Sequence, residues 1–250
     1  MPGALAGKVA VVTGAGRNIG RSIALHLARD GAAVVVNGRS NQDAIESVAA
    51  EIAALGGQAI AHLADVSDPE AVAGMVRRAA DEFGSVDIAV SNAGLRRQTA
   101  FLDMSFVEWR EILSVALDGV FILAQAAVPH MIRRGGGAII GLSGISTHVG
   151  TPNRAHVSAS KAGLEGLMRA LAVELAPHGI RCNSVAPGAV DTVRGASAGA
   201  MPSRMRDAAL PLGRKASVDE IAAVVRMLAG PEGGYITGQT IHVNGGAFLT

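Results

Sequence analysis

The sequence of 250 residues is poor in aromatic side chains, cysteine and net charge. Aromatic residues make up 3% of it, and Tyr235 is its only tyrosine. The single cysteine, Cys182, excludes an internal disulfide and fits a reducing cytoplasm. A net charge of +1 gives no electrostatic reason to expect a nucleic-acid or membrane partner.

Long hydrophobic runs are also missing. No apolar run reaches the roughly 18 residues of a membrane span, because Asp118 interrupts the most apolar stretch, 115–128. The first strand pattern begins by Lys8 and leaves no room for a secretory signal. We therefore expect a cytoplasmic protein without a membrane segment, and we assign no metal site.

Apolar runs of strand length alternate with helical patterns along the chain. The runs are continuous, which is typical of parallel strands covered on both faces. The sequence therefore predicts an α/β fold, a single-domain, doubly wound, Rossmann-like parallel sheet of about seven strands. We expect strands near residues 8–13, 33–37, 58–63, 86–91, 137–143, 180–185 and 239–243. We expect helices near residues 18–30, 41–55, 68–83, 106–133, 154–177 and 217–229.

The segment 190–214 breaks this alternation. It is rich in Ala, Gly, Ser, Arg and Met, and it follows the carboxyl end of a predicted strand. A long insertion at that place often forms a mobile lid over a site, and a plain surface loop is the alternative. We predict a substrate lid at 190–214 within one domain, 1–250.

A glycine-rich turn joins the first predicted strand to the first predicted helix. Its glycines are Gly14, Gly16 and Gly20. Glycines let the backbone approach a pyrophosphate, and the free N–H groups and dipole of the helix favour its negative charge. The turn therefore predicts a dinucleotide cofactor, which the residues Gly14, Arg17, Asn18, Ile19 and Gly20 would contact.

This turn resembles the T-G-x-x-x-G-x-G turn of the short-chain dehydrogenase/reductase family, with Asn18 where the family has its middle glycine. Asparagine tolerates positive φ best among the other residues, so Asn18 should weaken cofactor binding at most. The resemblance continues in order over nearly the whole chain, ending in the C-terminal segment 233–246. It implies further cofactor contacts from Asp65, Val66, Asn92, Ala93, Gly94, Pro187, Gly188, Val190 and Thr192.

The end of the second predicted strand indicates which cofactor is used. An NAD site places a carboxylate there, but this chain reads Gly38-Arg39-Ser40. Arg39 can pair with a 2′-phosphate, and Arg17 is a second basic candidate. We predict NADP rather than NAD; the alternative is that both arginines only solvate the surface.

The catalytic residues that the resemblance implies are largely missing. The family carries Asn, Ser, Tyr and Lys, and Lys161 matches the lysine, which would hold the nicotinamide ribose. Val157 stands at the tyrosine position, Gly144 at the serine position and Ala116 at the asparagine position. Tyr235 is not followed by a lysine at the family spacing, so it does not fill the role.

Two residues near these positions are candidates for the missing proton donor. His156 has a suitable pKa range, but one helical step turns its side chain about 100° from Val157. A surface or subunit-contact histidine is the alternative. Ser143, and beyond it Ser146, can orient a carbonyl, or simply bond to local backbone.

These patterns favour an NADP(H)-dependent oxidoreductase that acts on an unknown carbonyl or alcohol with a non-standard proton donor. The alternative is an NADP(H)-binding protein without dehydrogenase activity, a sensor or a partner of another enzyme. A lyase reaction ranks lowest, because the nucleotide turn is nearly intact.

Two further expectations concern ligands and partners. Arg96 and Arg97 follow a predicted strand and suggest an anionic small-molecule ligand; solvated loop charges are the alternative. The family resemblance implies a homo-oligomer, a dimer or tetramer, built on the helices at 106–133 and 154–177. From the sequence alone, these helices are equally compatible with core positions.

Overall fold

The structure, a computed structural model, describes residues 3–193 and 210–249. Seven parallel strands form one sheet in the order β3-β2-β1-β4-β5-β6-β7. The predicted doubly wound α/β sheet is thereby confirmed. The chain reverses its direction of travel across the sheet between β1 and β4, where ligands bind in such folds. The strands are β1 (Val9–Val12), β2 (Ala33–Gly38), β3 (Ala59–Leu63), β4 (Ile88–Ser91), β5 (Gly137–Leu142), β6 (Ile180–Pro187) and β7 (Thr240–Val243).

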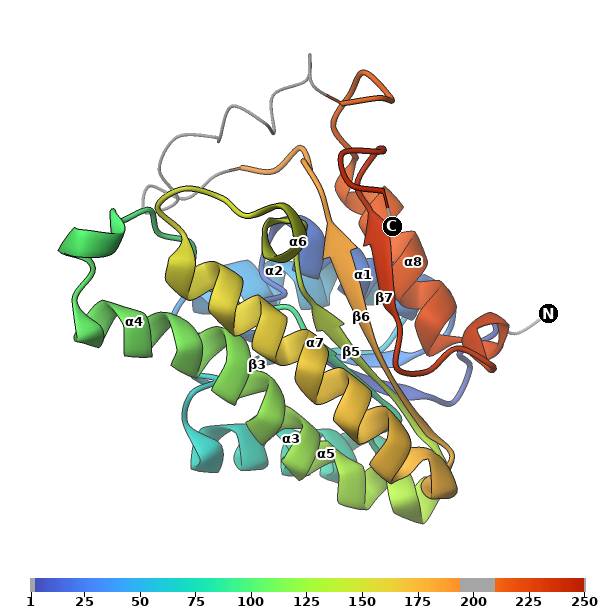
Figure 1. Ribbon diagram of the computed structural model, residues 1–250. Coiled ribbons are helices and arrows are strands. Elements are labelled where there is room, and N and C mark those ends of the chain that lie inside the picture. Colours follow the sequence, from blue (N-terminus) through green and yellow to red (C-terminus); the bar gives the residue numbers. More distant parts are fainter. Residues whose placement is uncertain (1–2, 194–209, 250) are drawn as a thin grey trace.

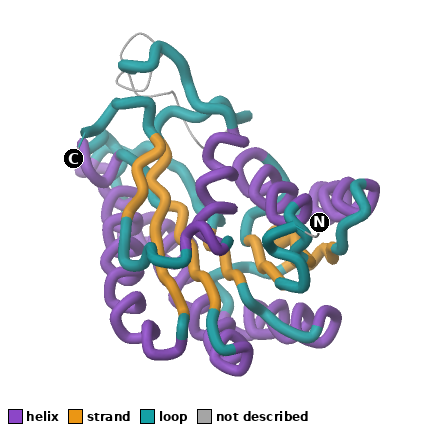
Figure 2. Tube along the Cα trace, turned by 90° about the vertical axis from the view of Figure 1, so that its right-hand side faces the viewer, coloured by secondary structure: helices purple, strands orange, loops and turns teal. Residues whose placement is uncertain are grey.

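Helices cover both faces of the sheet (Figures 1 and 2). Alternate strand residues point to opposite layers: Val12 packs in one core and Val11 in the other. Helices α1, α2 and α8 cover the first core, and α3, α5 and α7 cover the second. The helices are α1 (Asn18–Arg29), α2 (Gln42–Ala54), α3 (Pro69–Phe83), α4 (Phe106–Leu113), α5 (Gly119–Arg134), α6 (Ser146–Val149), α7 (Ala155–Leu175) and α8 (Val218–Ala229).

The long helix expected at 106–133 is interrupted. A π-helical turn, η2 (Ser114–Asp118), separates α4 from α5, so the prediction of one regular helix was wrong at its centre. Phe106–Arg134 is long and apolar enough to span a membrane by length and composition, and an 18-residue window within it has a mean hydropathy of 1.8. Half of that window is buried in the fold, as in the core helix of a sheet protein.

The predicted lid falls partly outside the described residues, because 194–209 are not among them. Both flanks of the segment are anchored to the sheet edge. Val190 pairs with Ala216 in a parallel bridge, and the Leu212 N–H donates to the Gly245 carbonyl at 3.2 Å. The described flanks, 190–193 and 210–214, therefore lie near the carboxyl ends of β6 and β7.

Candidate active site

An outer cavity of about 350 Å³ opens at the carboxyl ends of the strands, around the reversal point between β1 and β4. It brings together most of the residues predicted to bind the cofactor. It is lined by Gly14, Arg17, Asn18, Ile19, Gly20, Asn37, Arg39, Ala64, Asp65, Val66, Asn92, Ala93, Gly94, Leu95, Arg96, Val115, Thr192 and Val193. Six predicted cofactor residues are not among them: Gly38 and Ser40 line neither cavity, and Lys161, Pro187, Gly188 and Val190 line the inner cavity described below.

The glycine-rich turn has the close backbone approach that its sequence predicts. Gly14 has φ +61°, and a Cβ at Gly20 would lie 2.2 Å from the Gly14 carbonyl oxygen. The Asn92 side chain donates to the carbonyls of Thr13 and Gly14, each at 3.0 Å. The Thr13 hydroxyl in turn accepts from the Asn92 and Ala93 N–H groups. The turn is thus fixed to the end of β4 before any ligand arrives.

Asn18 adopts the left-handed conformation that its place in the turn requires, with φ 51°. Its amide also pairs with the backbone of Val193: Nδ2 donates to the carbonyl at 2.9 Å, and Oδ1 accepts from the N–H at 3.1 Å. A glycine has no side chain for these two bonds. Sequence reasoning treated Asn18 only as a tolerated departure and missed this contact.

Polar side chains border the outer cavity at the end of β2 and in the adjacent loops. Arg17 and Arg39 both line the outer cavity. Asn37 is buried and fixed by four bonds, accepting from the Gly14 N–H and donating to the carbonyls of Gly38, His62 and Ala64. Burial acts to raise the pKa of Asp65, yet hydrogen bonds from Ser67 and the nearby Arg39 charge together lower it.

Three features of this cavity suit a dinucleotide. The N-terminus of α1 opens into it, and glycines stand where a Cβ would obstruct the approach. Two arginines supply cations for phosphates. At the end of β2 no carboxylate occupies the place that receives the ribose hydroxyls of NAD.

An inner cavity of about 150 Å³ adjoins the first and shares Asn92, Gly94, Arg96 and Thr192 with it. Its residues come from the ends of β5 and β6 and the first turns of α7. It is lined by Ile19, Asn92, Gly94, Leu95, Arg96, Leu142, Ser143, Gly144, Ile145, Ser146, Arg154, Val157, Lys161, Pro187, Gly188, Ala189, Val190 and Thr192. The predicted residues Lys161, Ser143, Pro187, Gly188 and Val190 all belong to this set.

Lys161 is the only lysine that lines either cavity in the described part of the chain. Its Nζ donates to the Leu142 carbonyl at 2.5 Å. The pKa of Lys161 is lowered to about 8, first by burial and then by the Arg96 charge, while the Glu165 charge acts in the opposite direction. The side chain keeps some accessible surface, toward the cavity, although protein surrounds Nζ closely.

Val157, one turn before Lys161 on α7, faces the inner cavity and offers no proton. The only tyrosine, Tyr235, is fully exposed and lines neither cavity. The inner cavity therefore has no phenol among its described lining residues, and its hydroxyl groups are those of Ser143, Ser146 and Thr192.

Ser143 begins a polar chain that leads away from the inner cavity. Its hydroxyl donates to Glu165 Oε1, and Glu165 is buried, with 5% of its surface exposed. His148 Nε2 lies 3.1 Å from the same oxygen, and the His148 side chain is 22% exposed. The His148 ring packs against His242 and Phe248 from the C-terminal strand and tail. Sequence reasoning missed Glu165, because a lone acid in a helical pattern gives no sign of burial.

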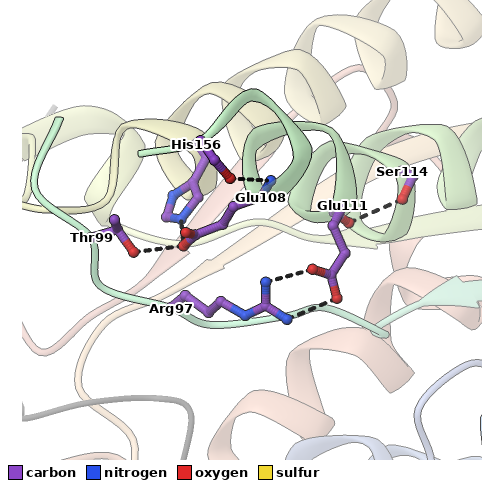
Figure 3. Close-up of polar contacts among 7 residues, drawn as sticks. Arg97, Thr99, Glu108, Glu111, Ser114 and His156 are labelled. Carbon is purple, nitrogen blue, oxygen red and sulfur yellow. Dashed lines mark hydrogen bonds and ion pairs between the residues drawn. The ribbon is translucent and has the colours of Figure 1, made fainter. Parts of the chain in front are cut away.

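His156 lies in a different network, shown in Figure 3. It is fully buried, and its Nε2 lies 3.1 Å from Glu108 Oε1. Thr99 donates to the same Glu108 oxygen at 2.6 Å, and this bond is the largest cause of the lowered pKa of Glu108. His156 lines neither cavity, so the structure does not support it as the proton donor, and its complete burial contradicts the alternative of a surface histidine. Its contacts tie α7 to α4 and to the loop after β4.

The arginines near the two cavities have different surroundings. Arg97 makes a bidentate ion pair with Glu111 on α4 and lines neither cavity. Arg96 lines both cavities. Arg154, at the N-terminus of α7, is 6% exposed and lines the inner cavity. Sequence reasoning missed Arg154, because nothing in its loop suggested burial.

Comparison with known proteins identifies the family. Residues 14–247 match the family model described as enoyl-(acyl carrier protein) reductase, which belongs to the short-chain dehydrogenase/reductases. The chain belongs to the short-chain dehydrogenase/reductase family. Its similarity to 3-oxoacyl-(acyl-carrier-protein) reductase FabG of Staphylococcus aureus is 42% identity over 243 residues, 97% of this chain and 98% of the relative. It is 39% identical to L-rhamnose 1-dehydrogenase (NAD(P)(+)) of Sphingomonas over 98% of both chains.

Solved structures of this family have the same fold. A 7α-hydroxysteroid dehydrogenase in complex with NADH and 7-oxo glycochenodeoxycholic acid matches with a TM-score of 0.91 at 33% identity, over 97% of this chain and 94% of that one. A dehydrogenase/reductase of Sinorhizobium meliloti matches with a TM-score of 0.90 at 34% identity, over 98% and 96%. These relatives are dehydrogenases and reductases, so the chain is a member of an oxidoreductase family that uses nicotinamide cofactors.

Proposed function

We propose that the protein is an NADP(H)-dependent oxidoreductase that interconverts a carbonyl and an alcohol, with Ser143 as the proton donor. The observation that carries this proposal is the junction of the two cavities. The outer one has the features of a dinucleotide site, and the inner one holds Lys161 and a serine that is hydrogen-bonded to a buried acid.

The residues of the outer cavity would hold the cofactor. Arg39 and Arg17 line that cavity and suit a 2′-phosphate, since guanidinium–phosphate pairs are strong and often bidentate. The Lys161 ammonium suits the nicotinamide ribose, for which it would exchange its bond to the Leu142 carbonyl. When bound, the reduced cofactor supplies a hydride to the carbonyl carbon.

The proton would come through Ser143. The Ser143 hydroxyl would turn from Glu165 to the carbonyl oxygen and give it a proton as the hydride adds to the carbon, and Glu165, protonated through His148, would return a proton to the Ser143 oxygen. His148 Nε2 lies 3.1 Å from Glu165 Oε1, and the partly exposed ring would take up the replacement proton from water and pass it to Glu165. In the direction of oxidation, the same groups carry the proton outward.

Turnover of Ser143→Ala tests this assignment. A positioned proton donor contributes about 10²–10⁴ in rate, so kcat should fall at least 100-fold while the Kd for NADPH stays within twofold. Ser158→Ala is the matched control, because the Ser158 hydroxyl lies outside both cavities and bonds to the Ser146 carbonyl at 3.4 Å. The readout is NADPH consumption against a panel of carbonyl, quinone and imine compounds.

Two results would count against the proposal. A Ser143→Ala enzyme with kcat within twofold of the unaltered protein would exclude Ser143 as the donor. Tight binding of NADPH without turnover of any compound would favour the alternative, a cofactor-binding protein without dehydrogenase activity.

We also propose a homo-oligomer. Figure 1 shows α4, α5 and α7 in front of the sheet, and several large apolar side chains of α4, α7 and the segment just before α4 are exposed. The most exposed of them are Phe101, Leu102, Phe106, Val107 and Val173, each at least 75% exposed. Four of these five residues lie within 101–107, and exposed apolar side chains clustered in this way mark interaction sites. Sedimentation velocity should show a dimer or tetramer at micromolar concentration, and a monomer at all concentrations would contradict this.

A further inference from the structure

We propose that the inner cavity recognises substrates that carry a carboxylate, and that Arg154 binds this carboxylate. The substrate class is then short oxo acids and the matching hydroxy acids. The identity of the reaction rests on the proposed function, but the binding of the carboxylate does not.

The charged side chains that line the inner cavity are all positive. Three cationic side chains line it, those of Arg96, Arg154 and Lys161. Among the described lining residues there is no aspartate or glutamate. Glu165 is hydrogen-bonded to Ser143 and His148 and does not line the cavity. An anion that enters the cavity therefore meets cations and no carboxylate from the lining.

Arg154 is buried, which strengthens its attraction for a carboxylate. Only 6% of its surface is exposed, and it still lines the cavity. A guanidinium in such a place attracts a carboxylate more strongly than a surface arginine does, because the protein screens the charges less than water. Arg154 is also the N-cap residue of α7, a helix of 21 residues, so the positive end of the helix dipole acts in the same direction.

The position and size of the cavity define the ligand. Ser143 and Lys161 provide the polar groups for the reacting carbonyl, and Arg154 lines the same cavity from the start of α7. A cavity of about 150 Å³ is smaller than the roughly 300–1,000 Å³ of sites for drug-sized ligands. The balanced reaction is oxo acid plus NADPH plus a proton giving hydroxy acid plus NADP⁺. The hydride adds to the carbonyl carbon, and the carboxylate takes no part in bond making.

Matched pairs of acids and amides test the proposal without requiring turnover. Pyruvate, acetoacetate and levulinate are compared with pyruvamide, acetoacetamide and levulinamide, because each pair differs in charge and little in size. Binding is measured by calorimetry on the full-length protein saturated with NADP⁺. We expect at least one acid to bind at least tenfold more tightly than its amide.

Two variants of Arg154 then test whether this residue causes the preference for acids over amides. Arg154→Gln should reduce the acid-to-amide ratio to within twofold, and Arg154→Lys, which keeps the charge, should retain part of it. Because Arg154 is buried, thermal unfolding of each variant is recorded, and the lysine variant keeps the test valid if the glutamine variant does not fold. Arg110→Gln is the control, since the Arg110 side chain is 55% exposed and lies outside both cavities.

The outcomes separate this proposal from the proposed function. Equal affinity for the acids and amides, including no binding of any, would overturn it, as would a preference unchanged in both Arg154 variants. Binding of an acid through Arg154 without NADPH oxidation would support the carboxylate site and contradict the proposed oxidoreductase activity.

Discussion

The outer and inner cavities adjoin at the same edge of the sheet, but they are built differently. The outer cavity depends on backbone: a left-handed glycine, a helix N-terminus and carbonyls that Asn92 fixes. The inner cavity depends on single side chains, and the position one turn before Lys161 holds Val157. A site built from backbone geometry survives most substitutions of its neighbours. A catalytic site can change its chemistry with one residue.

This difference explains why the cofactor is better defined than the reaction. The phosphate site needs close approach, free N–H groups and two arginines, and each leaves a trace in the sequence. The proton donor needs one hydroxyl at the right place. In the proposed mechanism Ser143 meets that need because Glu165 and His148 lie behind it, and these contacts join the segment 143–148 to α7.

The largest effect is expected for Gly20→Ala in the outer cavity. The new Cβ would lie 2.2 Å from the Gly14 carbonyl oxygen and 2.5 Å from Asn92 Nδ2, so the fixed turn must move. We expect a loss of about 3 kcal/mol in unfolding free energy and at least 100-fold weaker NADPH binding. Urea unfolding and calorimetry measure the two effects.

Gly74→Ala is its control. A Cβ there meets nothing closer than Arg77 Nη2 at 3.8 Å, so this variant on α3 should gain about 0.5–1 kcal/mol. Equal stability changes in the two variants would show that the turn is not tightly packed.

Lys161→Met in the inner cavity should stabilise the protein without ligand. The difference between the ordinary pKa of 10.5 and about 8 corresponds to about 3 kcal/mol. Burial penalises the charged form, so the penalty is fully present below pH 8 and disappears as pH rises toward 10.5. The gain in unfolding free energy should therefore be largest at pH 7 and small near pH 10, while turnover is lost. A gain that does not change with pH would contradict the assigned pKa.

Arg39→Gln should change cofactor choice rather than stability. A hydrogen bond to a charged group contributes about 1.5–3 kcal/mol, so the NADPH affinity should fall about 10- to 100-fold. The affinity for NADH should stay within twofold, because NADH has no 2′-phosphate for Arg39 to bind. Calorimetry with both cofactors measures the ratio, and Arg29→Gln, at the other end of α1, is the control. If Arg39→Gln lost equal affinity for NADPH and NADH, Arg39 would have no role in choosing between the two cofactors.

Asn18→Gly should have the smallest effect. Glycine relieves a left-handed strain of less than about 1–2 kcal/mol, but it removes both bonds to Val193 and adds backbone entropy to the unfolded chain. We expect a net loss of about 1 kcal/mol. Asn153→Gly is the matched control, because Asn153 also has positive φ, 61°, and makes no side-chain hydrogen bond within the described residues. If thermal scans showed equal destabilisation in Asn18→Gly and Asn153→Gly, the hydrogen bonds between Asn18 and Val193 would contribute nothing to stability.

The sheet was predictable because its strands are buried on both faces. Strand β2, for example, is almost entirely buried and reads as the continuous apolar run Ala33–Val36. The π-helical turn at Ser114–Asp118 was not predictable, since the apolar pattern continues through it. One additional residue in a turn changes the hydrogen bonding but hardly the composition.

The candidate site was predictable where it depends on local sequence. Gly14, Gly20 and Arg39 lie in short motifs next to strand ends, and all three line the outer cavity. Arg154 and Glu165 were not found, because their burial depends on packing between distant segments. No local pattern distinguishes a buried charge on a helix from a solvated one.

The central claim is that this protein transfers a hydride from NADPH to a substrate although no tyrosine lines either cavity. The most direct measurement is the incubation of the purified protein with NADPH carrying deuterium at C4 and each of the three oxo acids, followed by mass spectrometry of the hydroxy acid. We predict a product one mass unit heavier at the carbinol carbon, with formation at least 100-fold slower in Ser143→Ala. NADPH that binds tightly and leaves every oxo acid unlabelled and unreduced would contradict this account.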